Sequence, residues 1–203
     1  MHALLPALLT ADEFLAVGNP DTAKLELVRG VVRAMSPGNG GHGSISTNLV
    51  ERLAPYVRAH RLGRVFGDNT GFLLPLPIEL RRRSPDGEPR DTVRSPDAAF
   101  LRRSKVPPGG FGRGWVRAAP DFAVEVLSPD ETTSETDEKL DDYRAAGTSL
   151  LWVVDAATRR VTVYAADAPT RWFCSGDTLD GGTVIPGFAI PVDDLFEDVA
   201  VED

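Results

Sequence analysis

The sequence predicts an α+β (α/β) protein in which a mixed central β-sheet is flanked by two main helices. Two observations support this class. Apolar segments of strand length outnumber segments with helical periodicity, and the longer helical segments fall at only two places. Residues 149–155 (SLLWVVD) are almost continuously apolar, which is typical of a strand buried on both faces between helices.

The N-terminal third is predicted to hold a short helix, a hairpin and the first main helix. Residues 10–17 begin with Thr10 as the N-cap, and Glu13 stands at the capping-box position. Residues 24–35 form two apolar runs around Arg29-Gly30, a pattern typical of a hairpin. We expect a Pro/Gly-rich loop at 36–43. A helix of about 16 residues, ending near position 60, is then predicted by four apolar residues spaced four apart: Ile45, Leu49, Leu53 and Val57.

The middle of the chain is predicted to consist of strands and loops. Residues 64–67 and 71–76 are two expected strands around a turn at Asp68-Asn69. Residues 81–94 are polar and contain proline, so we expect a mobile insertion there. Residues 97–101 (DAAFL) form a short strand, and 106–119 a second Gly/Pro-rich loop anchored by Trp115.

The C-terminal half begins with an apolar strand at 121–127. The second main helix starts at Thr133 or Ser134 and runs to about Ala146, where Gly147 stops it. Residues 149–155 and 160–165 are expected to pair as a hairpin. Further strands are predicted at 170–174 and 183–185, and a short turn or helix at 191–196.

Length and composition indicate an ordinary globular chain. Its 203 residues suffice for one domain, which we expect over 1–203, with a core at 10–165 and C-terminal strands and tail at 166–203. No apolar stretch approaches the roughly 20 residues that span a bilayer. The opening MHALLPALLTADEF lacks the basic flank and cleavage site of a signal peptide. We therefore expect no membrane segment and a cytoplasmic location.

Charge and metal-binding residue types narrow the function. One cysteine and three widely spaced histidines disfavour a disulfide or a zinc site. A net charge of −8 argues against a protein that coats nucleic acid, but not against a nuclease with acidic metal ligands. The basic clusters are expected to be solvated loops. They are Arg81, Arg82, Arg83, Arg90, Arg94, Arg102, Arg103 and Lys105.

Two carboxylates point to a cation site. Glu125 lies inside the apolar run FAVEV, and a lone buried carboxylate costs several kcal/mol unless it is paired, protonated or metal-bound. Asp97 opens the preceding apolar strand. If the strands are neighbours, the two side chains lie about 5 Å apart at Cβ and repel unless a cation separates them. Mg²⁺ or Mn²⁺ fits such oxygen ligands. Two alternatives stay open: Asp97 as a turn residue and Glu125 as a solvent-facing residue of an edge strand.

Several segments carry a resemblance. SPDAAF, APDFAVEVLSPDETTSETDEKLDDYRAAG and LLWVVD resemble the Uma-two family of restriction-endonuclease-like proteins, as does LELVRGVVRAMSPGNGGHGSI near the N-terminus. The likeness covers about 10–165. The family belongs to the PD-(D/E)xK nuclease superfamily. The resemblance therefore implies a mixed sheet between helices, a divalent-metal site and hydrolysis of phosphodiester bonds in nucleic acid.

Carried over by position, the resemblance assigns the metal ligands and the lysine. Asp97 is the aspartate of the PD element, Glu125 the acid of the (D/E)xK element, and the backbone carbonyl of Val126 a further metal ligand. The lysine of that element would fall at Leu127, so the chain departs from the superfamily there. The family pattern suggests that Lys139, in the following helix, supplies the ammonium group instead.

Other residues have a functional and a plain interpretation. The resemblance makes Glu26 an acid that orients a water or binds a second ion, but it could equally face solvent on the hairpin. His42 is expected to touch substrate phosphate, or else to cap its helix. Lys139 could form a surface i, i+4 ion pair with Glu135. Tyr143, one turn further on, is expected in the core or beside the site.

The sequence thus predicts a divalent-metal-dependent nuclease. The alternative is a non-catalytic interaction or regulatory module of the same fold with a relict acidic pocket, which Leu127 and the acidic balance favour. Pro120-Asp121 also spells PD, but it lies on the same strand as Glu125 and cannot be its partner. A homodimer is left open.

Overall fold

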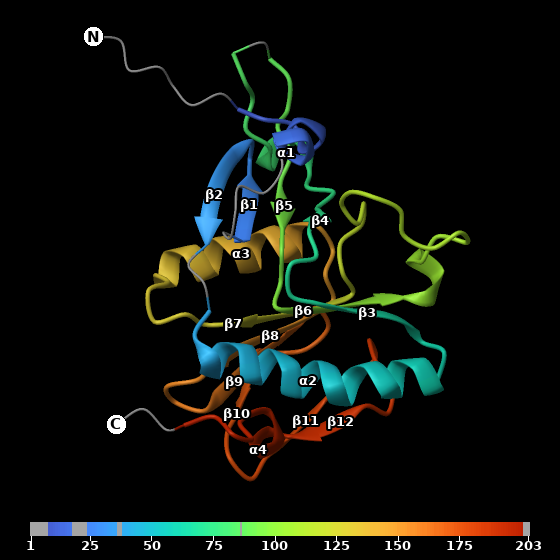
Figure 1. Cartoon of the computed structure of the whole chain (residues 1–203), viewed down its shortest axis with the longest axis vertical. Helices are drawn as coiled ribbons and strands as arrows, with labels where there is room; N and C mark the ends of the chain where they lie inside the picture. The colour runs from blue at the N-terminus through green and yellow to red at the C-terminus, as the bar shows by residue number, and fades with distance from the viewer. Residues whose placement is uncertain (1–7, 18–23, 36–37, 86, 201–203) are drawn as a thin grey trace.

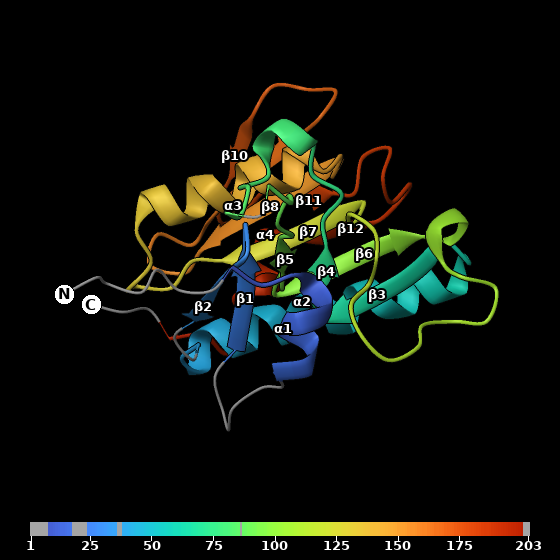
Figure 2. The ribbon, with the colours of Figure 1, turned by 90° about the horizontal axis from the view of Figure 1, so that it is seen from above.

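Two long helices, α2 (Gly40–Ala59) and α3 (Thr133–Ala145), lie on opposite faces of a six-stranded sheet in the computed structural model (Figure 1). The structure describes residues 8–17, 24–35, 38–85 and 87–200. The sheet has the order β10-β9-β8-β7-β6-β3, with β7 parallel to β8 and the other neighbours antiparallel. Its strands are β3 (Gly63–Gly67), β6 (Ala98–Arg102), β7 (Phe122–Val126), β8 (Leu150–Asp155), β9 (Arg160–Ala165) and β10 (Arg171–Phe173). Seen from above, β3, β6 and β7 lie side by side (Figure 2). The predicted mixed sheet between two main helices is confirmed.

The remaining strands form two smaller sheets. A four-stranded sheet in the order β2-β1-β5-β4 lies on the α3 side, in the upper half of Figure 1, and a two-stranded sheet lies beyond α2. The four-stranded sheet contains β1 (Lys24–Val28), β2 (Val31–Met35), β4 (Phe72–Leu73) and β5 (Val93–Arg94); the smaller one contains β11 (Thr178–Asp180) and β12 (Ala189–Pro191). The short helices are α1 (Ala11–Val17), η1 (Ile78–Leu80), η2 (Arg103–Lys105) and α4 (Val192–Leu195). The sequence predicted one central sheet and did not anticipate this division. β3 and β4, predicted around one turn, pair in different sheets.

Strand alternation decides which helix each side chain of β7 meets. Val124 and Val126 belong to the same buried cluster as Leu53 of α2. Ala123 belongs to the cluster that contains Leu140 of α3. Since successive side chains of a strand point to opposite faces, one set of β7 side chains packs on α2 and the other on α3.

Local capping sets where the helices begin. The Asn39 side chain accepts a hydrogen bond from the His42 backbone N–H at 2.9 Å, so α2 begins at Gly40. The predicted loop at 36–43 is therefore wrong from Gly40 onward, and 36–37 lie outside the described residues. A good cap is worth about 1 kcal/mol and offsets part of the poor helix propensity of the glycines. In α3, Thr132 and Glu135 form a capping box.

The predictions for 81–94 and 183–185 need correction, whereas the hairpin predicted at 24–35 is confirmed. Within 81–94, Arg83 pairs with Pro89 in a β-bridge, and the segment ends in buried strand β5. Thr183–Ile185 is not a strand but part of a turn, in which the Val184 N–H donates to the Gly181 carbonyl at 3.1 Å. The hairpin is confirmed: β1 and β2 pair antiparallel, with positive φ at Arg29 and Gly30, as a tight hairpin turn requires.

Candidate active site

Asp97, directly before β6, and Glu125 of β7 lie on neighbouring segments of the large sheet and line the same cavity. β6 and β7 pair with Ala98 opposite Val124, which brings Asp97, directly before β6, beside Glu125. Both carboxylates are buried. Because Val124 packs on the α2 side, Glu125 points toward α3. The two acids that the sequence singled out therefore lie together.

Three donors hold the Asp97 carboxylate. Its Oδ2 accepts the Val126 backbone N–H at 2.8 Å and lies 3.2 Å from His42 Nε2. Its Oδ1 accepts from Lys24 Nζ at 2.9 Å. Burial alone would raise the pKa of Asp97, but the His42 hydrogen bond and the Lys24 charge outweigh burial and bring that pKa to about 2. Asp97 is therefore an anion at neutral pH. The metal-binding role of the Val126 carbonyl stays a prediction.

Glu125 has different surroundings. Its Oε1 accepts from the Tyr143 hydroxyl at 2.7 Å, and its Oε2 lies 3.2 Å from Lys139 Nζ. Burial raises the pKa of Glu125; the charge of Lys139 opposes this rise and that of Asp97 adds to it. The two neighbouring acids thus have pKa values shifted in opposite directions.

Lys139 of α3 reaches the sheet, as the family pattern suggested. It is 5% exposed, and its ammonium group contacts Glu131 at 2.7 Å in addition to Glu125. Burial would lower the pKa of Lys139, but the surrounding carboxylates outweigh burial and raise it. The alternative surface pair with Glu135 is wrong, because that carboxylate accepts from the Thr132 N–H at 2.9 Å in the capping box.

His42 lies in the first turn of α2, where the Asn39 cap positions it. Its imidazole faces Asp97, and the hydrogen bond to this carboxylate is the main cause of a raised His42 pKa. The ring also takes part in lining the cavity described below. Its contact with substrate phosphate stays a prediction.

Glu26 belongs to a buried ion network that the sequence did not reveal. Its Oε1 accepts the Ser95 N–H at 2.8 Å, and its Oε2 binds Arg94 Nη1 at 2.8 Å. The Arg94 guanidinium also binds Asp142 Oδ2, at 2.6 Å from Nη2. Arg94 is 2% exposed, so its assignment to a solvated basic loop is wrong. The i, i+3 spacing of Lys139 and Asp142 was a signal that these side chains share the buried face of α3.

Lys24 and Asp68 were also missed. Lys24 begins β1, and its ammonium group contacts Asp68 Oδ1 at 2.5 Å as well as Asp97. Asp68 lies in the turn that follows β3. Neither residue lies in an apolar run with an unexpected charge, which was the signal that identified Glu125.

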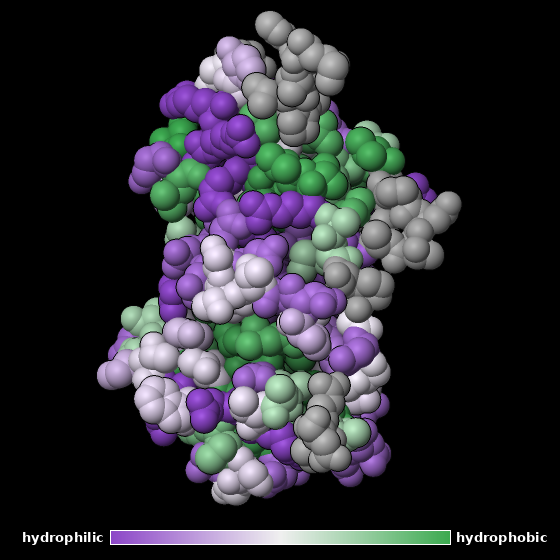
Figure 3. Space-filling model, turned by 90° about the vertical axis from the view of Figure 1, so that its left-hand side faces the viewer, coloured by the Kyte–Doolittle hydropathy of each residue, from purple (hydrophilic) through white to green (hydrophobic). Residues whose placement is uncertain are grey.

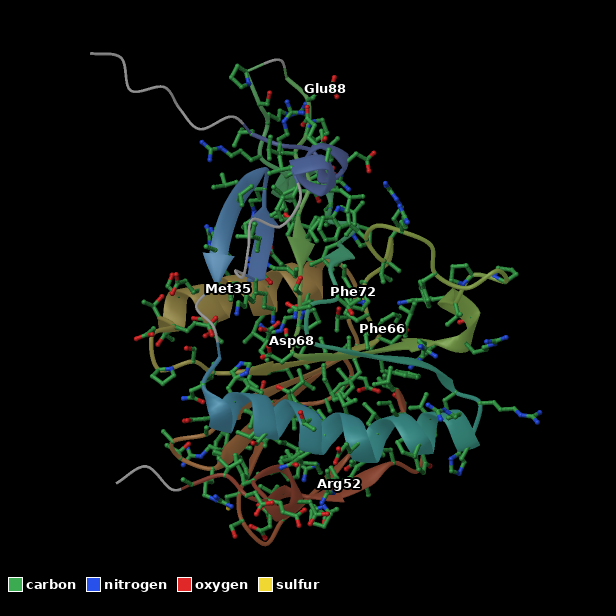
Figure 4. All side chains as sticks on the ribbon, viewed as in Figure 1. Met35, Arg52, Phe66, Asp68, Phe72 and Glu88 are labelled. Atoms are coloured by element: carbon green, nitrogen blue, oxygen red, sulfur yellow. The ribbon has the colours of Figure 1, made fainter. Side chains whose placement is uncertain are left out.

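These side chains surround one cavity of about 340 Å³. Met35 and Asp68, which help to line it, lie at mid-height between the upper sheet and α2 in Figure 4. On the face shown in Figure 3, hydrophilic residues gather at mid-height, between more apolar areas. The charged residues around the cavity include Lys24, Glu26, Asp68, Arg94, Asp97, Glu125, Glu131 and Lys139.

Comparisons with known proteins agree with this architecture. The model of the Uma2 family, described as "Putative restriction endonuclease", matches residues 11–193. The chain belongs to the Uma2 family. A crystal structure described as a "putative nuclease belonging to DUF820" from Anabaena variabilis ATCC 29413 is similar, with a TM-score of 0.75 and 22% sequence identity. The match covers 93% of this chain and 98% of that one, and it shows a shared fold. The restriction-endonuclease-like fold class is thus confirmed. A comparison with curated proteins finds no match.

The donor set of this Uma2 protein suits a hard cation. In the part of the chain that the structure describes, no group of three or more His, Cys, Asp or Glu side chains is arranged to hold a metal. Mg²⁺, however, needs only one or two carboxylates and keeps several waters. Asp97 and Glu125 offer two carboxylates at one polar cavity. The charge compensation expected from a cation is supplied in part by two ammonium groups of the chain, those of Lys24 and Lys139.

Among the helices that the structure describes, none has the length and apolar character to cross a bilayer.

Proposed function

We propose that this Uma2 protein is a divalent-metal-dependent nuclease that hydrolyses phosphodiester bonds of nucleic acid. The observation that carries the proposal is the convergence of Asp97, Glu125 and Lys139 at one cavity, from two adjacent strands and the helix that follows them. Two acids with oppositely shifted pKa values and a buried ammonium group are typical of catalytic sites rather than of solvated surfaces.

The carboxylates of Asp97 and Glu125 are the proposed ligands of Mg²⁺ or Mn²⁺, with the Val126 carbonyl as a third. When bound, such an ion polarises a phosphate oxygen and lowers the pKa of a coordinated water. The chain's own contacts fix the ligands beforehand. The Val126 N–H orients Asp97, and the Tyr143 hydroxyl orients Glu125. Rigid positioning of this kind is what a metal site requires of surrounding residues.

Lys139 supplies a fixed positive charge. Because its ammonium group is held by Glu125 and Glu131, it stays at the cavity without substrate. A preorganised cation stabilises the negative charge that develops on phosphate during hydrolysis. His42, whose imidazole contacts Asp97 at the same cavity, is the proposed phosphate contact.

Glu26 enters the proposal with a narrower role than the sequence gave it. Both of its oxygens accept hydrogen bonds, from Ser95 and Arg94, so a water or second ion would have to share them. Its charge also helps to raise the pKa of Lys139 and thereby keeps the ammonium group protonated.

The non-catalytic alternative rested on Leu127 in place of a lysine and on the acidic balance of the chain. The ammonium group of Lys139 beside Glu125 supports the enzyme over this alternative. We also propose a single domain, a cytoplasmic location and a homodimer. The proposed nuclease activity does not depend on any of these three.

The test is cleavage by the full chain of mixed DNA and RNA substrates, with Mn²⁺ or with a chelator. We expect wild type to cleave in the presence of Mn²⁺ and not in the presence of the chelator. Glu125→Gln should not cleave under either condition. Glu51→Gln is the matched control, because Glu51 is an exposed residue of α2. Cleavage by Glu125→Gln at the wild-type rate, or no cleavage by wild type with Mn²⁺ on any substrate, would overturn the proposal.

A further inference from the structure

The Lys24 ammonium group lies between two carboxylates at the edge of the cavity. It is 2.9 Å from Asp97 Oδ1 and 2.5 Å from Asp68 Oδ1. The two acids come from different places, Asp68 from the turn after β3 and Asp97 from the residue directly before β6. A positive group of the chain itself thus lies where carboxylates converge.

Lys24 holds the oxygen of Asp97 that a metal would need. Oδ2 is already engaged by the Val126 N–H and by His42. Oδ1 is the oxygen that Lys24 contacts. A cation that binds Asp97 through Oδ1 therefore meets the ammonium group directly, and like charges at this distance repel strongly.

The two lysines of the site are held differently. The side chain of Lys24 is 17% exposed and one of its partners, Asp68, is 46% exposed, so this ion pair reaches the solvent edge of the cavity. The side chain of Lys139 is 6% exposed, and both of its partners are largely buried. A lysine stem is flexible and its ammonium group is readily hydrated, so Lys24 can withdraw toward solvent. Withdrawal of Lys139 would leave two largely buried carboxylates, Glu125 and Glu131, whereas withdrawal of Lys24 would leave only one, Asp97.

We propose that Lys24 competes with the divalent cation for Asp97, and that its withdrawal frees Asp68 to become a further ligand. The inference rests on the metal-dependent function proposed above. It names two residues that set the metal affinity of the site. Metal binding then exchanges one cation for another between the same carboxylates, so wild type binds metal more weakly than its acidic residues alone would allow.

The test is a calorimetric titration of the metal-free full chain with Mn²⁺. We expect Lys24→Met to bind Mn²⁺ about tenfold more tightly than wild type or better, because a unit charge a few ångströms away is worth at least that factor. Adding Asp68→Asn to Lys24→Met should reverse most of the gain. Lys105→Met is the matched control: Lys105 lies 3.0 Å from a different buried acid, Asp121, outside the cavity. It should bind like wild type.

Equal or weaker Mn²⁺ binding by Lys24→Met overturns the competition, while binding by wild type leaves the proposed metal site intact. If neither wild type nor Lys24→Met binds Mn²⁺, both the competition and the proposed metal site are overturned. Binding by Lys24→Met alone supports the competition. Thermal unfolding of each variant checks that it folds. Should Lys24→Met not fold, Lys24→Gln carries the same expectation, because it also removes the charge.

Discussion

Arg94 should contribute more to the stability of the folded protein than any surface ion pair, because it joins the buried acids Glu26 and Asp142. Its guanidinium is 2% exposed and binds two carboxylates, Glu26 and Asp142, that are each 1% exposed. Arg94→Met keeps an apolar side chain but removes the cation that both acids share, while Asp142 keeps its contact with Arg29 Nη2 at 2.6 Å. Removal of one partner from a buried ion pair costs about 3–5 kcal/mol. For a chain of this size, that loss lowers the melting temperature by roughly 6–20 °C.

Urea denaturation of the metal-free protein measures the loss. Arg52→Met is a matched control, because Arg52 also binds two acids, Asp194 at 3.0 Å and Glu197 at 2.7 Å, but the side chains of both of these acids are exposed. An exposed pair is worth about 0–1 kcal/mol. A loss for Arg94→Met as small as that for Arg52→Met would refute the reasoning. Adding Asp142→Asn should recover part of the loss, since it removes one of the two buried negative charges that Arg94 balances.

The side chains that contact Asp97 and Glu125 can be tested in the same way. Tyr143→Phe should lower the free energy of unfolding by about 1.5–3 kcal/mol, because a hydrogen bond to the buried Glu125 carboxylate is lost; chemical denaturation measures this. The raised pKa of His42 should contribute stability to the metal-free protein that is fully present just below the ordinary histidine pKa of 6.5 and is lost as pH rises through the folded-state pKa. His42→Gln should flatten the stability profile in that window. Lys139→Ala should reduce cleavage roughly a hundredfold while Mn²⁺ binding survives, measured by turnover and calorimetry.

Each of these has a contradicting outcome. Tyr56→Phe is the control for Tyr143→Phe, since the Tyr56 hydroxyl donates to a backbone carbonyl, that of Pro186. An equal loss of unfolding free energy in both variants would show that the hydrogen bond to Glu125 adds no extra stability. A pH profile unchanged by His42→Gln would show that the imidazole does not pair with Asp97 in solution. Full cleavage by Lys139→Ala would assign the lysine a structural role alone.

The sequence predicted most helices and strands, but not which charged side chains pair with one another in the folded protein. Glu125 could be found because a charge inside an apolar strand is conspicuous. Its orientation toward α3 became known only from the packing of the strand. Lys24 and Arg94 carry no such mark: the first opens a strand and the second follows a polar segment. Their importance comes from pairing across 73 and 68 residues of chain, with Asp97 and Glu26 respectively. Such contacts depend on how the sheets pack, which local patterns do not encode.

The start of α2 also could not be predicted from apolar spacing, although the residues that decide it are close in sequence. The spacing of Ile45 and its successors predicted α2, but the glycines before it suggested a loop. The side chain of Asn39 decided otherwise by accepting one backbone N–H. The turn at Thr183–Ile185 was predicted as a strand, but Val184 and Ile185 are buried because the turn packs onto the large core.

The position of Glu125 also has a consequence for folding. β7 is apolar on both faces except for this carboxylate. If β7 paired one residue out of register, Glu125 would turn toward α2, among Leu49, Leu53 and other apolar side chains. There it would meet none of its present donors, and a buried carboxylate without a partner costs several kcal/mol. The charge therefore distinguishes the native strand alignment from its nearest misaligned competitor. The alternation of apolar side chains alone could not do so in a strand that is buried on both sides.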